Sequence, residues 1–200
     1  MNFVKQTQKI VVAVIAVIAI LAVSGRADAE SGWTWPSVSE SGVVLGYGEG
    51  TISEGKYRPF LMIWHVGFNL KEFSSTQSEG RKNALSLFLE PQINPAFSPR
   101  TDAEFGVGIG LQYRHYLTER LSAFIMASVG PHWITLQTAD QENGFIFADT
   151  AGVGVSLLVT EKSSLDLGIR IRHLSNAGIA EPNGGIDTWL GTVGYSVFFR

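Results

Sequence analysis

The feature that most limits the fold of this chain is a strict period-two alternation, which residues 103–117 show best. One face of this segment is mainly apolar: Ala103, Phe105, Val107, Ile109, Leu111, Tyr113, His115 and Leu117. The other face carries glycine and a few polar groups: Glu104, Gly106, Gly108, Gly110, Gln112, Arg114 and Tyr116. Alternation of this kind indicates a β-strand whose two faces meet different environments.

Glycine within such strands indicates which environments those are. The chain has 22 glycines and only 7 prolines. Small residues suit the crowded interior of a narrow barrel, and the apolar face would then meet lipid. We therefore predict an all-β fold, an eight-stranded antiparallel transmembrane β-barrel. Its strands are expected near 42–49, 58–70, 83–94, 103–117, 121–134, 145–159, 164–175 and 186–199.

The lengths of the connections agree with this topology in part. Residues 118–120 and 160–163 are short enough for periplasmic turns, and 135–144 and 176–185 are long enough for outer loops. The 71–82 connection is long and polar where a short turn is expected, and the first strand has a weak pattern. The C-terminal segment alternates through Tyr195, Val197 and Phe199, a pattern typical of barrels exported to the outer membrane of Gram-negative bacteria.

The N-terminus has the pattern of a secretory signal peptide. Lys5 and Lys9 precede an unbroken apolar run over 10–23, and small residues at 27 and 29 suit signal peptidase. We predict a signal peptide over 1–29 and the barrel over 30–200. The alternative is an uncleaved anchor, for which the apolar run is short. Trp33 and Trp35 are expected at the periplasmic interface.

Composition excludes several classes of function. The chain has no cysteine, so neither disulfides nor thiol catalysis are available. Its formal charge of −3 and scattered basic residues do not indicate nucleic-acid binding. No metal site and no cofactor are expected, and the oligomeric state is left open.

The 164–175 strand ends in residues that carry chemistry. His173 and Ser175 continue the outward face of Leu165, Leu167, Ile169 and Ile171. From residue 165 to 175 the strand rises about 25 Å at a tilt of roughly 40°, close to the height of the apolar band of such barrels. Ser175 is therefore expected at the outer-leaflet interface, where lipid esters lie.

A carboxylate is expected beside this pair. Asp187 shares the outward face of Trp189 and Val193, and it begins the last strand beside the end of the 164–175 strand. In a serine hydrolase, Ser175 would attack an ester, His173 would act as the base and Asp187 would orient the imidazole. Three further residues are candidate oxyanion or substrate groups: Asn176, Gly178 and Asn183.

The run from His173 to Asp187, H-L-S-N-A-G-I-A-E-P-N-G-G-I-D, resembles the C-terminal signature of the lipid A 3-O-deacylase family, the PagL-like outer-membrane enzymes. The resemblance implies an eight-stranded barrel that removes the acyl chain esterified at the 3 position of lipid A in lipopolysaccharide. It also implies a metal-free triad of Ser175, His173 and Asp187. The family acid is typically glutamate, so the shorter Asp187 requires a closer backbone, a bridging water or a weaker contact.

Two other functions remain open, and the remaining polar residues have structural interpretations. The alternatives are a non-catalytic barrel of structural or adhesin type and an outer-membrane phospholipase. His115 is interpreted as interfacial. The inward-facing polar residues are expected to fill the lumen, several as a buried charge network: His65, Glu90, Arg114, His132, Arg170 and Arg172.

Overall fold

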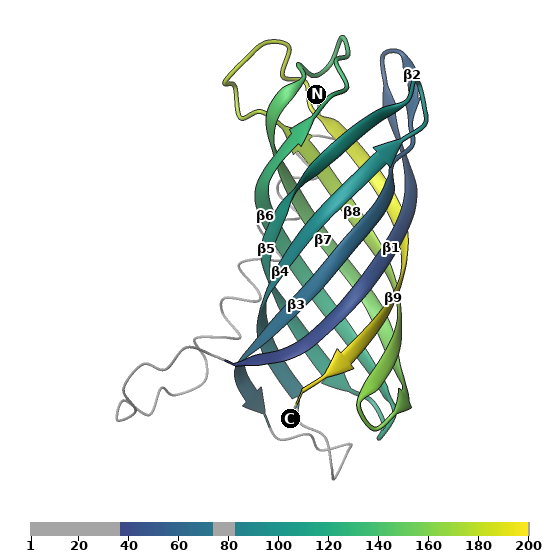
Figure 1. Cartoon of the computed structure of the whole chain (residues 1–200), viewed down its shortest axis with the longest axis vertical. Helices are drawn as coiled ribbons and strands as arrows, with labels where there is room; N and C mark the ends of the chain where they lie inside the picture. Colours follow the sequence, from purple (N-terminus) through teal and green to yellow (C-terminus); the bar gives the residue numbers. More distant parts are fainter. Residues whose placement is uncertain (1–36, 74–82, 200) are drawn as a thin grey trace, which may run out of the picture.

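A computed structural model describes residues 37–73 and 83–199, which form one closed β-barrel (Figure 1). The predicted signal peptide, the interfacial Trp33 and Trp35, and most of the 71–82 connection lie outside the described residues. The strands are β1 (Val38–Ile52), β2 (Gly55–Tyr57), β3 (Phe60–Phe73), β4 (Asn83–Ala96), β5 (Asp102–Tyr116), β6 (Leu121–Ile134), β7 (Gly144–Thr160), β8 (Ser163–Ser175) and β9 (Ile186–Phe198).

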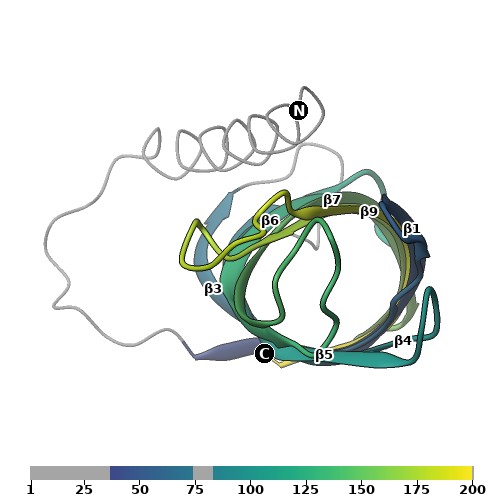
Figure 2. The ribbon, with the colours of Figure 1, turned by 90° about the horizontal axis from the view of Figure 1, so that it is seen from above.

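The eight long strands pair in sequence order, and β1 pairs with β9 to close the ring (Figure 2). Every pairing is antiparallel. Closure leaves no long strand with a free edge, as lipid requires. We call the end with the connections 53–54, 97–101, 135–143 and 176–185 the loop end, and the opposite end the turn end. The predicted eight-stranded antiparallel barrel is therefore confirmed.

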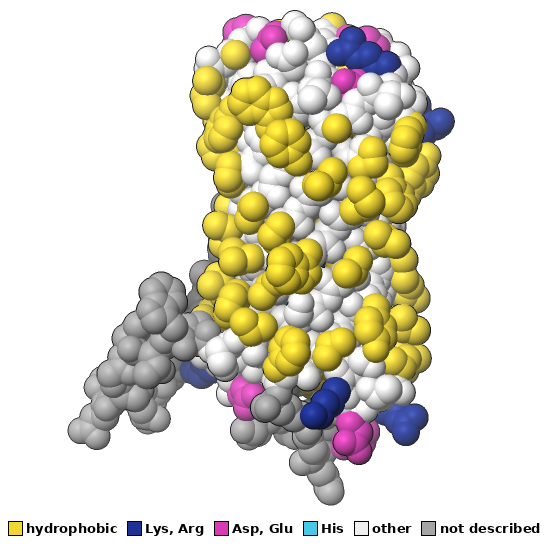
Figure 3. All heavy atoms as spheres, in the orientation of Figure 1, with side chains coloured by type: hydrophobic (Ala, Val, Ile, Leu, Met, Phe, Trp, Pro, Cys, Tyr) yellow, Lys and Arg dark blue, Asp and Glu magenta, His cyan; other side chains and the backbone are white. Residues whose placement is uncertain are grey.

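The outer wall is apolar between two polar ends (Figure 3). Every long strand has at least one large hydrophobic side chain that is two-fifths or more exposed on its outward face, among them Trp64, Ile109, Leu167 and Trp189. So much exposed apolar surface is typical of a wall that meets lipid. Among the described residues, no helix is long and apolar enough to cross a membrane.

The lumen holds the predicted charge network in separate layers. Glu90 accepts two hydrogen bonds from Arg170, at 2.7 and 3.0 Å, and lies 3.0 Å from His65 Nδ1. Nearer the loop end, Arg172 donates to Glu104 at 3.0 Å. These charges tie strands together across the lumen, and His132 also faces inward. Nearer the turn end, a third layer joins Arg114 to Glu40 at 2.9 Å.

An apolar cluster closes the lumen at the loop end. It consists of buried side chains from several strands and from the 135–143 connection: Ile52, Tyr57, Ala96, Ile134, Leu136, Ile146, Ala148, Leu174 and Ile186. The connection between β6 and β7 crosses the opening above it (Figure 2). The strand ends at this rim are therefore held from inside.

The structure differs from the prediction mainly in the first strand and in one additional short strand. The first strand runs over Val38–Ile52 rather than 42–49, because its backbone pairs with β3 on one side and β9 on the other despite a weak side-chain pattern. The short strand β2 folds back on β1 before the third strand begins, and the sequence analysis did not predict it.

Candidate active site

The end of β8 and the start of β9 bring His173 and Asp187 together. The two residues are direct partners in the β8–β9 register. His173 Nδ1 lies 2.9 Å from Asp187 Oδ1, a hydrogen-bond distance. The shorter aspartate thus reaches the imidazole directly, because directly opposed residues have closely spaced Cβ atoms. A protonated Nδ1 donates to Asp187 and leaves Nε2 as the nitrogen able to accept a proton.

His173 is far less exposed than its place on the outward face suggests. Only 1% of its surface is accessible, whereas Leu167 on the same face of β8 is 59% exposed. Gly185 packs against the imidazole: a Cβ there would overlap Cε1 and lie 3.0 Å from Nε2. Its φ of 77° is also unfavourable for a residue with a side chain. His173 therefore keeps its outward position in the strand, but the backbone of the loop covers its ring.

Ser175 lies two residues beyond His173, at the last position of β8. It is partly exposed and pairs with Phe147 of β7. In the part of the chain that the structure describes, its hydroxyl makes no hydrogen bond, and so none to His173. Such contacts are often long in a ligand-free enzyme and shorten when substrate binds.

A second carboxylate flanks the imidazole on the other side. Asp149 of β7 is the direct partner of His173, so His173 stands between Asp149 and Asp187 in one row of outward positions. Asp149 is only partly buried. The sequence analysis missed it. The available signal was its parity, because Asp149 shares the outward face of Val153 and Val155.

The three other predicted site residues shape the loop that follows Ser175. Asn176 Nδ2 donates to Ala180 O at 2.7 Å, and Asn176 Oδ1 accepts the Gly178 N–H at 3.0 Å. Asn183 Oδ1 accepts the Asn176 N–H at 2.9 Å. The Gly178 amide is therefore occupied in this structure. The Asn183 Nδ2 group has no partner among the described residues.

This loop is fastened to its neighbours at the loop end. Asn183 forms a β-bridge with Gln141, and Pro182 O accepts the Glu142 N–H at 2.8 Å. Asp140 in turn accepts hydrogen bonds from Ser53 of the β1–β2 hairpin. Three connections thus support one another, and they hold the segment that covers His173.

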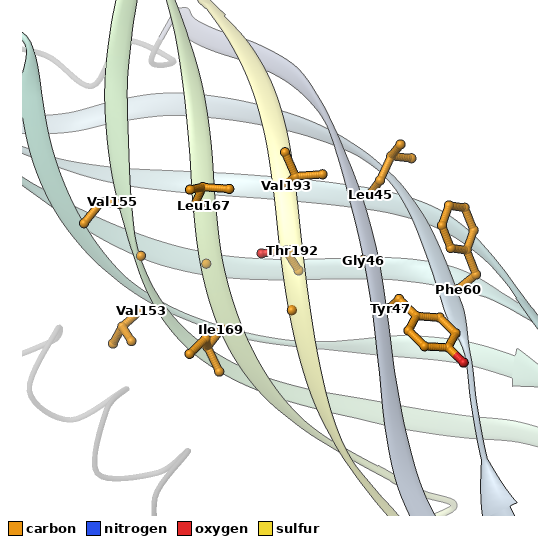
Figure 4. A pocket seen from close by; sticks show the side chains of 13 residues that line it. Leu45, Gly46, Tyr47, Phe60, Val153, Val155, Leu167, Ile169, Thr192 and Val193 are labelled. Carbon is orange, nitrogen blue, oxygen red and sulfur yellow. The ribbon is translucent and has the colours of Figure 1, made fainter.

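A shallow groove of about 690 Å³ lies on the wall between the site and the turn end (Figure 4). It crosses β7, β8, β9 and β1 and reaches the start of β3. Gly191 is the direct partner of both Ile169 and Tyr47, and its missing side chain leaves a gap between them. Asp187 lies four residues from Gly191 on β9, about 13 Å along the strand. The groove therefore begins close to the site.

The remaining polar candidates lie elsewhere. His65 and His132 are buried in the lumen, and His115 is partly exposed on the outer wall near the turn end. Within 37–73 and 83–199, no group of three His, Asp or Glu side chains is placed to hold a metal ion.

A comparison with protein families supports the sequence resemblance. The model of the family described as lipid A 3-O-deacylase (PagL) matches residues 59–196. This range is more than half of the chain and includes Ser175, His173 and Asp187. A search of curated proteins gave no significant match.

Three solved structures share the fold. The outer membrane enzyme PagL is 17% identical with a TM-score of 0.56, covering 78% of this chain and 99% of that one. Neisserial surface protein A is 14% identical with a TM-score of 0.62, covering 83% and 100%. The N-terminal β-barrel domain of Pseudomonas aeruginosa OprF is 12% identical with a TM-score of 0.51, covering 81% and 98%. At these identities the likeness shows the barrel fold alone.

Proposed function

The chain belongs to the lipid A 3-O-deacylase (PagL) family, and we propose that it hydrolyses the acyl ester at the 3 position of lipid A with a Ser175–His173–Asp187 triad. The observation that carries this proposal is the 2.9 Å contact between Asp187 and His173, the residue two positions before Ser175. A buried imidazole oriented by a carboxylate beside a partly exposed hydroxyl is the arrangement that serine hydrolases use.

The reaction follows from these roles. Ser175 Oγ attacks the ester carbonyl carbon while its proton moves to His173 Nε2. The tetrahedral intermediate collapses, and Nε2 returns the proton to the departing sugar oxygen. Water then attacks the acyl–serine in the same way and releases the fatty acid. Throughout, Asp187 holds the ring by Nδ1 and stabilises the imidazolium.

The oxyanion needs donors that are not already engaged. Of the predicted candidates, Asn183 has the least engaged donor: its Oδ1 holds the loop through the Asn176 N–H, and its Nδ2 group has no partner among the described residues. The second hydrogen of Asn176 Nδ2 is a further candidate. Gly178 N–H would first have to release Asn176 Oδ1. We therefore assign the oxyanion to the side-chain amides of the loop.

The surroundings of the site support a lipid substrate. Ser175 is the last residue of β8, at the loop end of the apolar wall, so an ester at the outer-leaflet interface could reach it without leaving the membrane. The groove around Gly191 could then hold the acyl chain along the wall. We propose that the barrel lies in the outer membrane of a Gram-negative bacterium with the loop end outside.

The test is the Ser175→Ala variant, refolded in detergent and checked by heat-modifiable electrophoretic mobility. We expect a folded barrel that releases no fatty acid from lipopolysaccharide by mass spectrometry, at least 10³-fold below wild type. Wild-type-like deacylation by this variant would refute the triad. A wild-type protein inactive on lipid A would favour a non-catalytic barrel, and one that cleaves phospholipid alone would favour a phospholipase.

A further inference from the structure

A pair of cations lies on the outer wall near the proposed triad. Lys56 of β2 and Arg58, the next outward residue, both contact Glu49 of β1. The Lys56 Nζ–Glu49 Oε1 distance is 2.7 Å, and Arg58 Nε donates to Glu49 Oε2 at 2.9 Å. All three side chains are two-fifths to one-half exposed, so ligands in the headgroup region can reach them.

The strand register places these cations at the height of the triad. His173 is the partner of Asp187, and Lys56 is the partner of Thr51. Thr188 and Gly50, which adjoin Asp187 and Thr51, are partners as well, so Asp187 and Thr51 lie at the same level. One outward row therefore runs from β8 through β9 and β1 to β2. Lys56 Nζ also donates to Thr51 Oγ1 at 3.1 Å, so the ammonium leans back over β1. With strands about 4.8 Å apart, it lies roughly 10 Å from His173 along the wall.

The charge of the cluster remains positive. One carboxylate holds two cations, so the group has a net charge of +1 and its guanidinium and ammonium hydrogens are not all used. Glu49 fixes the two groups side by side instead of neutralising both. A fixed guanidinium beside an ammonium is a good partner for a phosphoryl group, which accepts several charge-assisted hydrogen bonds.

We propose that Lys56 and Arg58 form a subsite for a phosphoryl group of the substrate headgroup. The proposal rests on the proposed function, because it assumes that the lipid whose ester lies at Ser175 is a phosphorylated glycolipid. Binding the phosphoryl group about 10 Å from the triad would fix which sugar ester reaches the nucleophile. The barrel would thereby bind the polar headgroup at Lys56 and Arg58 and the acyl chain in the groove.

The experiment compares lipid A with the same lipid after dephosphorylation, both in detergent mixed micelles. We expect wild-type kcat/KM to favour the phosphorylated lipid by about tenfold or more, because its charge-assisted contacts are lost on dephosphorylation. The Lys56→Gln/Arg58→Gln double variant should bring this ratio close to one. Glu49→Gln keeps both cations but no longer fixes them side by side, so it should give a ratio between those of the wild type and the double variant. If the three side chains served only to stabilise the hairpin, Glu49→Gln would act like the double variant.

Lys162→Gln is the matched control, since it removes a cation at the turn end and should leave the ratio unchanged. An unaltered ratio in the double variant, or no preference in the wild type, would overturn the proposal. Inorganic phosphate tests the other source of the same chemistry. Inhibition of the wild type on both lipids by submillimolar phosphate, lost in the double variant, would assign the cations to free phosphate and also overturn it.

A binding measurement separates this proposal from the proposed function. In the Ser175→Ala background, the dissociation constants for the two lipids are compared with and without the Lys56→Gln/Arg58→Gln changes. The subsite predicts tighter binding of the phosphorylated lipid only where both cations are present. This result does not require hydrolysis, so a failed triad and a failed subsite give different outcomes.

Discussion

In the described part of the barrel, the pairs His65–Glu90 and His173–Asp187 have nearly the same geometry. In the lumen, His65 Nδ1 lies 3.0 Å from Glu90 Oε1. On the outer wall, His173 Nδ1 lies 2.9 Å from Asp187 Oδ1. Both imidazoles are buried, and each contact joins neighbouring strands. The contact itself therefore does not distinguish a structural histidine from a catalytic one.

The surroundings of each pair make the difference. Glu90 also binds Arg170 through two hydrogen bonds, and the ring of His65 lies 5.1 Å from that of Phe88. That carboxylate is buried in the lumen and neutralised by a cation. Asp187 has only His173 as a side-chain partner among the described residues, and Ser175 stands two positions along the strand. A carboxylate without a cation can stabilise an imidazolium that forms during the reaction.

The largest expected effect comes from exchanging each histidine for glutamine. His173→Gln should lower kcat by about 10³- to 10⁴-fold, because the general base is lost while the barrel remains folded. His65→Gln should leave kcat close to wild type, because His65 lies away from the substrate. Fatty-acid release from lipopolysaccharide measures both. Equal losses in the two variants would remove the distinction between the pairs.

The next expected effect is on stability, and here the lumen pair is the important one. Glu90→Gln leaves Arg170 buried without its anion, and we expect a loss of about 3–5 kcal/mol in the free energy of unfolding. Urea unfolding of the barrel in detergent micelles measures it. Asp102→Asn is the control, since its pair with the exposed Arg100 should contribute less than about 1 kcal/mol. An equally small loss for both would contradict a structural role for the lumen network.

Most of the fold could be predicted because alternation and glycine placement are local properties of the sequence. Strands β3 to β9 follow the predicted ranges to within a few residues, and the lumen charges lie where parity places them. The ends of β1 and the existence of β2 could not be predicted. They depend on backbone pairing with β9 and β1 after closure, which side-chain patterns do not encode.

Only part of the site could be predicted from the sequence. Parity and a single loop are enough to place His173 beside Asp187. Asp149 belongs to β7 and meets His173 through the register of β7 and β8, which side-chain parity does not define. The burial of His173 depends on the path of the backbone at Gly185, and no period in the sequence describes that path.

A smaller expected effect concerns Asp149, which gives His173 a second neighbouring carboxylate. His173 faces carboxylates on both neighbouring strands, and a second negative charge helps to stabilise the imidazolium in the transition state. We expect Asp149→Asn to lower kcat about 10- to 30-fold with KM unchanged, because the interaction strengthens only when the ring becomes charged. Steady-state kinetics on lipid A measure both constants. A raised KM with normal kcat would instead make Asp149 a substrate contact.

The smallest expected effect concerns the wall beyond the triad, which has no counterpart in the lumen. Gly191 opens outward, and the nearest atom to a Cβ there is Tyr47 O at 4.0 Å, so a larger side chain fits without disturbing the strands. Gly191→Leu should fill the groove and lower kcat/KM about three- to tenfold for long acyl esters, because the chain loses apolar contact. Short esters should be affected much less.

Val129→Leu adds bulk on β6, outside the groove, and should not separate the two chain lengths. If Gly191→Leu lowers both lengths equally, the acyl chain lies elsewhere. If it separates them, the wall binds the lipid chain while the lumen pair only holds the barrel together.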